Sequence, residues 1–565
     1  MASWAEVVRW NPSVLTDAVG PINAAYNKLV ACSDDLRDIN TPNGWRGTAA
    51  EAAAQEVRQI IDGLEEHAAE IAALRRSVGD VGDAITGVQN GVREAQSVAA
   101  SHQMVIGDDG SVTDHGSPPD TPDDQKEVVA QERKRVATEL ADRVEEVLRQ
   151  AVDVDDDFCA VLDRILSGHT IDATTDDNDN VSLAAAGNSG AATAALSVLA
   201  PPPVDADPSM NAAWWAALSD RERQQMIADH PDLVGNRDGV KAADRSKANL
   251  LLLDKEKQSF SAELDRLKRD GGDSDEIARI EERLKAIDSI TGMMHNPDGT
   301  LNTHRQLMSL DLTGDHPKAA IANGNVDTAQ HVAVFTPGMN STVDGNMNGY
   351  VNDMQGVGRS AEDMLRRAGD MSNVATVTWL GYEPSSFDDV SSLTGLVTAE
   401  NVDVGGDKLT RFDQGINASR PIDPHLTALG HSQGSIVTGI SLAHGGTGVD
   451  DAVVFGSPGV ANHFGIDNTA HDLKVPDGHA YNIKAQGDGI AQWVPETWRY
   501  GAAPYAMDGM KQLSADAAMG PNGPLAGSHG HSEYTMTTPN GVDSTSKHNI
   551  AAIVAGKPQL TVPAQ

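Results

Sequence analysis

The stretch that most constrains the fold is residues 426–435, which read LTALGHSQGS. An apolar run ends at Gly430, Ser432 stands between two glycines, and a helical pattern of apolar residues follows. A serine on so sharp a strand-to-helix turn projects its hydroxyl beyond the end of a sheet, and Gly430 and Gly434 remove side chains that would collide there. The N-terminus of the following helix favours a developing negative charge. The pattern therefore predicts a nucleophile elbow centred on Ser432.

From His331 onward, short apolar runs alternate with helical patterns. The runs expected as strands are residues 332–335, 374–380, 426–429, 452–455 and 480–485. Such alternation predicts an α/β fold with a mainly parallel sheet and helices on both faces. Functional groups of this architecture gather at the C-terminal ends of the strands.

A serine hydroxyl needs a base to take its proton, and the base needs a third group to orient it. For a serine on this kind of turn, the chain order is Ser, then Asp or Glu, then His. Asp488 comes directly after the fifth expected strand and is the preferred acid. The rival carboxylates lie farther from a strand end; they are Asp467, Asp472 and Asp477.

The preferred base is His531, in the Gly-rich stretch GSHGHSEY of residues 527–534. His529 and His548 are the alternatives. A metal pair at His529 and His531 lacks the further ligands that would complete it, so neither a metal nor a cofactor is expected. His431, beside the serine, is interpreted as structural.

Two backbone N–H groups are needed to stabilise the oxyanion of an acyl-transfer reaction. We expect one from Gln433, the residue after the serine. The other is expected from the loop after Phe335, at Met339, with Asn340 as the alternative.

Composition excludes several partners. The chain has 565 residues, with 43 Lys and Arg against 82 Asp and Glu, for a net charge of −39. This charge argues against binding to nucleic acid or to anionic membrane surfaces.

Two distant cysteines, Cys32 and Cys159, form neither a disulfide framework nor a metal site. The sequence shows no signal peptide or membrane-spanning run, which favours the cytoplasm or export by a route that reads another signal.

The first third of the chain is predicted to be helical, at residues 12–38, in a longer helix that follows the turn at Gly47 and includes Val57 to Val92, and at 124–168. From Val57 to Val92 apolar residues recur every three or four places, with His67 at one seam position, as in helices packed along a seam. We expect residues 1–168 either to pair with a second helical hairpin, in another copy or a different protein, or to close as a three-helix bundle.

Helix, Trp45-Arg-Gly47 turn and helix resemble the WXG (ESAT-like) hairpins that actinobacterial type VII systems export. That resemblance covers roughly the first 100 residues and implies a helical-hairpin domain with type VII-like export. The Tyr-x-x-x-Asp/Glu export signal of those hairpins is not found here. The expected domains are a helical domain at 1–168, an acidic Ala/Pro-rich linker at 169–208, a helical unit at 209–325 and a sheet-containing domain at 326–565.

Residues 209–565 resemble actinobacterial α/β-hydrolases of unassigned function that often carry such a helical segment. The matching motifs are WW at 214–215, GNRDG at 235–239, RSKAN at 245–249, HVAVFTPG at 331–338, WLGY at 379–382, GHSQGS at 430–435, GSPG at 456–459 and GHSEY at 530–534. Members of that family usually carry Tyr where Gln433 stands. The resemblance implies an esterase- or lipase-like hydrolase with Ser432, Asp488 and His531 as its triad.

Two functions follow as hypotheses. The first is a serine hydrolase that cleaves carboxylic esters of small molecules or lipids through an acyl-enzyme. The second is a partner-binding or secretion-associated protein whose hydrolase domain is secondary or inactive.

Overall fold

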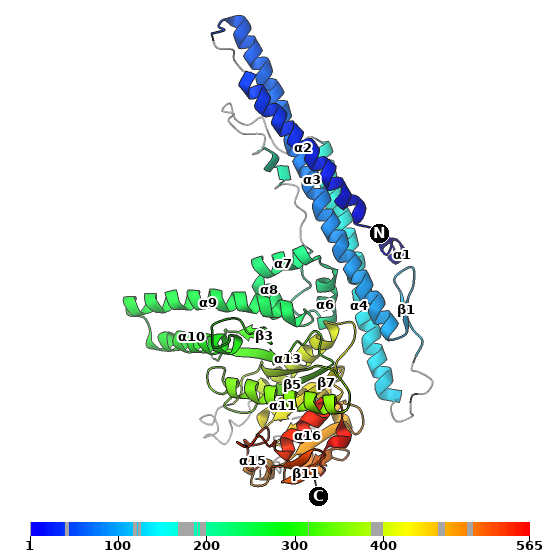
Figure 1. Ribbon diagram of the computed structural model, residues 1–565, viewed down its shortest axis with the longest axis vertical. Helices are drawn as coiled ribbons and strands as arrows, with labels where there is room; N and C mark the ends of the chain where they lie inside the picture. Colours follow the sequence, from blue (N-terminus) through cyan, green and yellow to red (C-terminus); the bar gives the residue numbers. More distant parts are fainter. Residues whose placement is uncertain are drawn as a thin grey trace.

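The computed structural model describes residues 2–39, 44–116, 121, 126–167, 186–188, 190–191, 199–314, 316–385, 399–460, 469–493 and 501–564. The molecule consists of a long helical arm, made by the N-terminal third, and an α/β body (Figure 1). The arm runs past one side of the body, and the C-terminus lies at the far end of the body from the arm's tip.

Three long helices build the arm, as the sequence predicts. They are α2 (Ser13–Ile39), α3 (Thr48–Ser101) and α4 (Lys126–Leu166). The short α1 (Trp4–Val7) and a hairpin of β1 (Met104–Ile106) and β2 (Val112–Asp114) add to them. The hairpin lies between the helix expected to include Val57 to Val92 and the helix expected at 124–168, where the sequence predicts no element. Its strands have three residues each, too few to give a readable alternation of apolar and polar positions.

The buried face of α3 differs from the predicted seam. Val78, Val81, Val88 and Val92 are buried as expected, but His67 is exposed and pairs with Glu70. Farther toward the tip, the buried apolar residues are small: Ala68, Ala69, Ala72 and Ala73. A strict 3.5-residue repeat drifts around a 3.6-residue helix, so a long straight helix turns part of such a stripe toward solvent.

Near the arm's tip, apolar side chains of α3 are only partly covered. Val57 and Leu64 are half-buried and Ile60 is 47% exposed. α4 reaches the level of Ala73, where Val161 packs. The pairing of residues 1–168 with a second helical hairpin stays a prediction.

The body is built on an eight-stranded sheet, counted over the described residues. The strand order is β10-β9-β8-β7-β5-β6-β4-β3. The strands are β3 (Arg305–Asp311), β4 (Lys318–Asn323), β5 (His331–Thr336), β6 (Val374–Leu380), β7 (His425–His431), β8 (Asp451–Phe455), β9 (Ala480–Ile483) and β10 (Lys511–Leu513). All neighbouring pairs from β10 to β6 are parallel, and β4 is antiparallel to both β6 and β3. The α/β class and the mainly parallel sheet are as predicted.

The antiparallel strands β3 and β4 lie in a region that was expected to be helical. β4 reads KAAIAN, and alanine has high helix propensity and low strand propensity. Its central residues are fully buried between β3 and β6. Tertiary pairing therefore outweighs local propensity here. Two helices precede these strands within the helical unit expected at 209–325, α9 at Ala242–Asp270 and α10 at Ser274–Met294.

Helices cover both faces of the sheet. α13 (Ala399–Ala418) and α14 (Gln433–His444) pack on the face that includes Val332, Leu426 and Val454. α11 (Met347–Arg367) and α16 (Thr545–Val554) pack on the other face, against Ala333, Leu429 and Val453. Alternate residues of the central strands thus point into two separate cores.

Backbone-to-backbone packing joins the arm to the body. A Cβ on Gly87 of α3 would lie 2.4 Å from the carbonyl oxygen of Ala217, at the end of α6 (Pro208–Ala217). From α4, the buried guanidinium of Arg143 donates to the carbonyl oxygen of Ala418, and Arg135 forms an ion pair with Asp423. The arm is therefore seated on α6 and on the end of α13.

The C-terminal end of the expected linker is packed against the body. Leu199 is buried, and its carbonyl oxygen accepts a hydrogen bond of 3.0 Å from the Trp214 indole. The Pro202 carbonyl accepts a hydrogen bond from Arg237. Arg237 follows two short helices, α7 (Asp220–Asp229) and α8 (Pro231–Gly235). Most of the linker before residue 199 lies outside the described residues.

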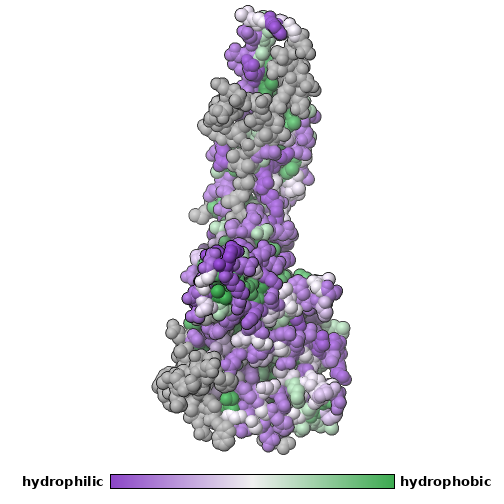
Figure 2. All heavy atoms as spheres, turned by 90° about the vertical axis from the view of Figure 1, so that its left-hand side faces the viewer, coloured by the Kyte–Doolittle hydropathy of each residue, from purple (hydrophilic) through white to green (hydrophobic). Residues whose placement is uncertain are grey.

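On the side of the molecule in Figure 2, hydrophilic side chains dominate the surface of the arm, and hydrophobic ones are scattered. Within the described ranges, no helix has the length and apolar character needed to cross a bilayer.

Candidate active site

The turn at Ser432 is strained in the way a nucleophile elbow requires. Ser432 has φ 53° and ψ −128°, a backbone conformation that non-glycine residues rarely adopt. Its N–H donates to the carbonyl of Phe455 on β8, and it directly precedes α14. A Cβ on Gly430 would lie 2.7 Å from the Cα of Ser435, so the strand and the helix can approach this closely only with glycine there.

The loop after β5 lies directly against this turn. A Cβ on Gly338 would come within 2.6 Å of the Ser432 Cβ. A Cβ on Gly434 would lie 2.1 Å from the carbonyl oxygen of Thr336. Two glycines, one on each segment, therefore let the loop and the start of α14 touch through their backbones.

Asp488 and His531 are joined, as the sequence leads us to expect. The Nδ1 of His531 lies 3.0 Å from both carboxylate oxygens of Asp488. A carboxylate can only accept, so Nδ1 carries the proton and Nε2 is left as the basic nitrogen. Asp488 lies in the segment between β9 and α15 (Gly489–Trp493). A β-bridge between Gln486 and His529 aligns that segment with residues 527–534, which we call the histidine loop.

The Asp488 carboxylate is completely buried and fully hydrogen-bonded. Its Oδ1 accepts the N–H groups of Ile490 and Ala491, and its Oδ2 accepts the Tyr534 hydroxyl at 2.6 Å. Burial by itself would raise the pKa of Asp488, but the hydrogen bonds from His531 and Tyr534 outweigh it and lower that pKa to about 2. Asp488 is therefore ionised at neutral pH.

His431, beside the serine, packs on the histidine loop. Its ring centroid lies 4.7 Å from that of His531, and its Nε2 donates to the His531 carbonyl oxygen at 2.9 Å. Burial, with a smaller contribution from the charge on His531, lowers the pKa of His431 to about 4. His431 is thus neutral at pH 7 and links the elbow to the loop that carries His531.

Ser432 Oγ does not hydrogen-bond to His531 within the part of the chain that the structure describes. The two residues are connected through His431, the chain neighbour of the serine. In substrate-free sites such hydrogen bonds are often long and tighten when substrate binds.

The rival residues lie in other environments. Asp472 accepts from Thr469, and Asp477 lies near His471. His548 lies in α16, and its ring contacts the carbonyl oxygen of Leu560. His529 adjoins His531, and its backbone N–H donates to Glu533. Asp467 lies outside the described residues.

The two expected oxyanion donors lie on the segments that touch at the elbow. Gln433 is the first residue of α14, a position whose N–H has no acceptor within the helix. Met339 follows Gly338 in the loop after β5 and is half-buried. Asn340, the alternative, has φ 56° and donates its N–H to the Ser385 carbonyl.

Sequence reasoning missed Tyr534 and Ser385. Tyr534 bonds Asp488, and Ser385 bonds the side chain of Gln433. Tyr534 stands three residues after His531, so its place in the GHSEY motif was an available signal. Ser385 had none, because its partner is 48 residues away in the chain.

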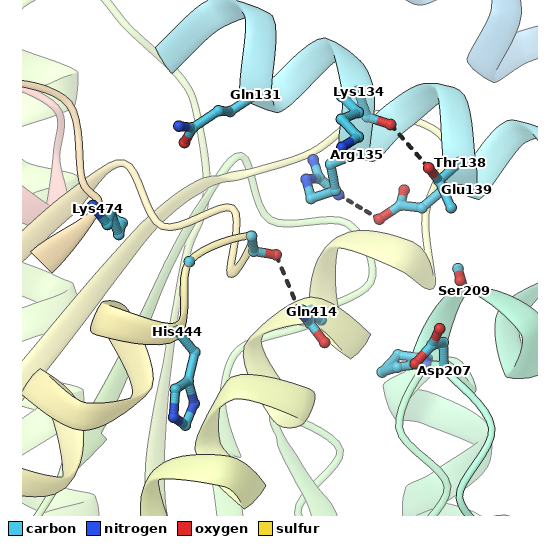
Figure 3. Close-up of a pocket in the computed structure, with 13 residues that line it drawn as sticks. Gln131, Lys134, Arg135, Thr138, Glu139, Asp207, Ser209, Gln414, His444 and Lys474 are labelled. Carbon is cyan, nitrogen blue, oxygen red and sulfur yellow. Dashed lines mark hydrogen bonds and ion pairs between the residues drawn. The ribbon is translucent and has the colours of Figure 1, made fainter. Parts of the chain in front are cut away.

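A separate pocket of about 510 Å³ lies between the arm and the body (Figure 3). Its wall includes Lys134 and Arg135 of α4, Gln414 of α13, His444 of α14 and Lys474. Arg135 is neutralised there by Glu139 and by other carboxylates. Ser432, Asp488 and His531 do not line this pocket, so it is distinct from the candidate active site.

The sheet order, the strained serine turn and the helices on both faces define the class of the protein, an α/β hydrolase. A sequence profile described as "Alpha/beta hydrolase" matches residues 314–497. An uncharacterized protein of Mycobacterium tuberculosis is 37% identical over 238 residues, covering 40% of this chain and 84% of that protein, and one of Mycobacterium bovis matches to the same extent. A second uncharacterized Mycobacterium tuberculosis protein is 28% identical over 316 residues, 52% of this chain and 46% of that protein. The chain belongs to this alpha/beta hydrolase family, which supports hydrolase activity.

Proposed function

We propose that this protein is a serine hydrolase that cleaves carboxylic esters of small molecules or lipids, with Ser432, Asp488 and His531 as its catalytic triad. The observation that carries the proposal is the His531–Asp488 pair. The imidazole is held by a buried, ionised carboxylate through Nδ1, which leaves Nε2 as a base. The pair stands on a loop bonded to the elbow of Ser432.

In the proposed reaction, Nε2 of His531 takes the Ser432 hydroxyl proton while Oγ attacks the ester carbonyl carbon. The negative oxygen of the tetrahedral intermediate accepts hydrogen bonds from the N–H groups of Gln433 and Met339. The imidazolium then protonates the leaving alcohol. Water, deprotonated by the same nitrogen, then attacks the acyl carbon, the bond to Ser432 Oγ breaks, and the imidazolium returns its proton to Oγ as the carboxylic acid leaves.

The environment of Asp488 favours this sequence of steps. His531 becomes positively charged when it takes the proton, and the adjacent carboxylate stabilises that charge without being protonated itself. A pKa of about 2 keeps Asp488 ionised throughout the neutral range. His431, whose pKa is lowered to about 4, stays neutral and does not add a competing positive charge.

A fluorophosphonate probe tests the proposal, because it reacts covalently only with an activated serine. We expect the wild-type protein to be labelled and Ser432→Ala and heat-denatured protein to be unlabelled. His531→Ala should label far more slowly. A panel of esters of increasing acyl length would then define the substrate class. Labelling that persists in Ser432→Ala, or a folded wild type that is never labelled, would contradict the proposal and favour a partner-binding role.

A further inference from the structure

The side chain of Gln433 contacts the segment that follows β6. Its Oε1 accepts the N–H of Ser385 at 3.0 Å, and its Nε2 donates to the Ser385 hydroxyl at 2.8 Å. Both residues are buried, with 2% and 8% of their surfaces exposed. One amide thus holds Ser385 through two hydrogen bonds, which fixes the position of that backbone segment.

The same segment holds the loop after β5 at two points. The Tyr382 hydroxyl donates to the Pro337 carbonyl at 2.7 Å. The Ser385 carbonyl accepts the N–H of Asn340 at 3.1 Å. Gly338 and Met339 lie between these two points, so the Met339 N–H is carried on a short stretch fastened on both sides.

The contacts form a continuous path from the elbow to Met339. It starts at Gln433, next to Ser432, passes through Ser385 and ends at Asn340, the neighbour of Met339. Gly338, which packs against Ser432, has no side chain that could hold the loop in place. The hydrogen bonds from the segment after β6 therefore support the loop, together with the Ser341 hydroxyl, which donates to the Gly338 carbonyl at 2.6 Å, and the Asn346 amide, which donates to the Asn340 carbonyl at 3.3 Å.

We propose that Gln433 is a positioning residue for the oxyanion site: its side chain, acting through Ser385, holds the Met339 N–H at the distance the transition state requires. This inference rests on the proposed serine hydrolase function. It gives Gln433 a second role, separate from that of its own N–H, which any residue at this position would supply.

The physical reason is the steep distance dependence of oxyanion stabilisation. A donor acts when it lies about 3 Å from the position the oxyanion will occupy, and loss of one donor costs about 100- to 1,000-fold in kcat. A loop that shifts weakens this contact in the transition state more than substrate binding in the ground state. The effect should therefore fall on kcat rather than on KM.

The test is ester turnover by the full-length chain. Gln433→Leu removes both side-chain hydrogen bonds with little change in volume. We expect kcat to fall about 10- to 100-fold, less than the complete loss of one oxyanion donor would cost, while KM stays within about twofold. Ser385→Ala removes the hydroxyl alone and should lower kcat about 3- to 10-fold, in line with one hydrogen bond. Because both changes break one path, the double variant should be no slower than Gln433→Leu.

A matched control is Thr438→Val, in the same helix. Thr438 is equally buried, and its hydroxyl has no hydrogen-bond partner among the described residues, so this change should leave kcat unchanged. Melting temperatures check that each variant is folded. If Gln433→Leu loses its fold, Ser385→Ala decides: wild-type kcat in that variant overturns the inference.

Wild-type kcat in folded Gln433→Leu, a change in KM alone, or losses that multiply in the double variant would also overturn it. These outcomes leave the proposed function standing as long as turnover depends on Ser432. A wild type without Ser432-dependent turnover overturns both.

Discussion

The Tyr534 hydroxyl donates a 2.6 Å hydrogen bond to Oδ2 of Asp488, the carboxylate that orients His531. The same hydroxyl accepts the backbone N–H of Ala485 at 2.9 Å. Burial, and then the hydrogen bond to Asp488, raise the pKa of Tyr534, so it stays a protonated donor at working pH. Tyr534 therefore ties the carboxylate to the segment that follows β9 (Ala480–Ile483).

We predict that Tyr534→Phe lowers both the acid resistance of the protein and its stability at pH 7. The pKa of Asp488, about 2 in the fold, lies below the ordinary value of about 3.9, so its contribution to the free energy of unfolding is fully present above about pH 4 and is lost as pH falls through about 2. Without the tyrosine donor the folded-state pKa rises toward the ordinary value, so this contribution is smaller and is lost completely at a higher pH. The variant should also lose about 1.5–3 kcal/mol at pH 7, typical of a hydrogen bond to a charged group.

Denaturant unfolding between pH 2 and pH 7 measures this effect. Tyr505→Phe is the control, because Tyr505 is 41% exposed and its ring contacts the ammonium of Lys484, not the carboxylate of Asp488. An acid-unfolding profile of Tyr534→Phe that superimposes on that of the wild type would show that the hydrogen bond does not determine the ionisation of Asp488.

We predict that Ser432→Ala and His531→Ala each lower kcat by about 1,000-fold or more, and that the double variant is no worse than the single ones, because triad members act as a unit. Steady-state ester hydrolysis measures this. His529→Ala is the control and should stay near wild type, since its described hydrogen bond is made by the backbone. Near-normal turnover in His531→Ala together with loss in His529→Ala would move the base to His529.

We predict that residues 209–565 fold without the arm, unfold cooperatively and hydrolyse a small ester. Both faces of the sheet are covered by helices of the body, so its cores do not depend on α2–α4. A fragment that starts at residue 199 should be more stable by about 1–3 kcal/mol, because it keeps the hydrogen bonds of Trp214 and Arg237 to Leu199 and Pro202. Two insoluble or unfolded fragments would show that the arm completes the fold of the body.

We predict that Gly87→Val separates the arm from α6 without stopping hydrolysis. A Cβ at position 87 would clash with the backbone of residues 217–219, which cannot move as a side chain can. Limited proteolysis should cut the arm faster in this variant. Gly79→Ala is the matched control, because a Cβ at position 79 meets nothing within 4 Å. This substitution should stabilise α3 by about 0.5–1 kcal/mol, since alanine favours a helix more than glycine does. Equal cleavage rates in wild type and Gly87→Val would argue against this contact.

By itself, the sequence determined the features that depend on neighbours in the chain. The glycines around Ser432, the apolar run before it and the helical pattern after it together predict the elbow, because turn chemistry and periodicity act over a few residues. The same reasoning predicts the parallel strands and the helical unit that contains α9 and α10. Chain order singles out Asp488 and His531, which the structure joins by hydrogen bonds; their catalytic role stays a proposal.

Tertiary structure alone decided the contacts between distant segments. β4 is a strand because β3 and β6 pair with it on both sides, although its alanines do not favour a strand locally. His67 turned to solvent because a straight helix cannot keep a 3.5-residue stripe on one face. Gln433 and Ser385, like Gly87 and Ala217, meet only when separate elements pack. Such pairs leave no periodic trace in the sequence, because each depends on how two whole elements are placed and not on the residues beside it.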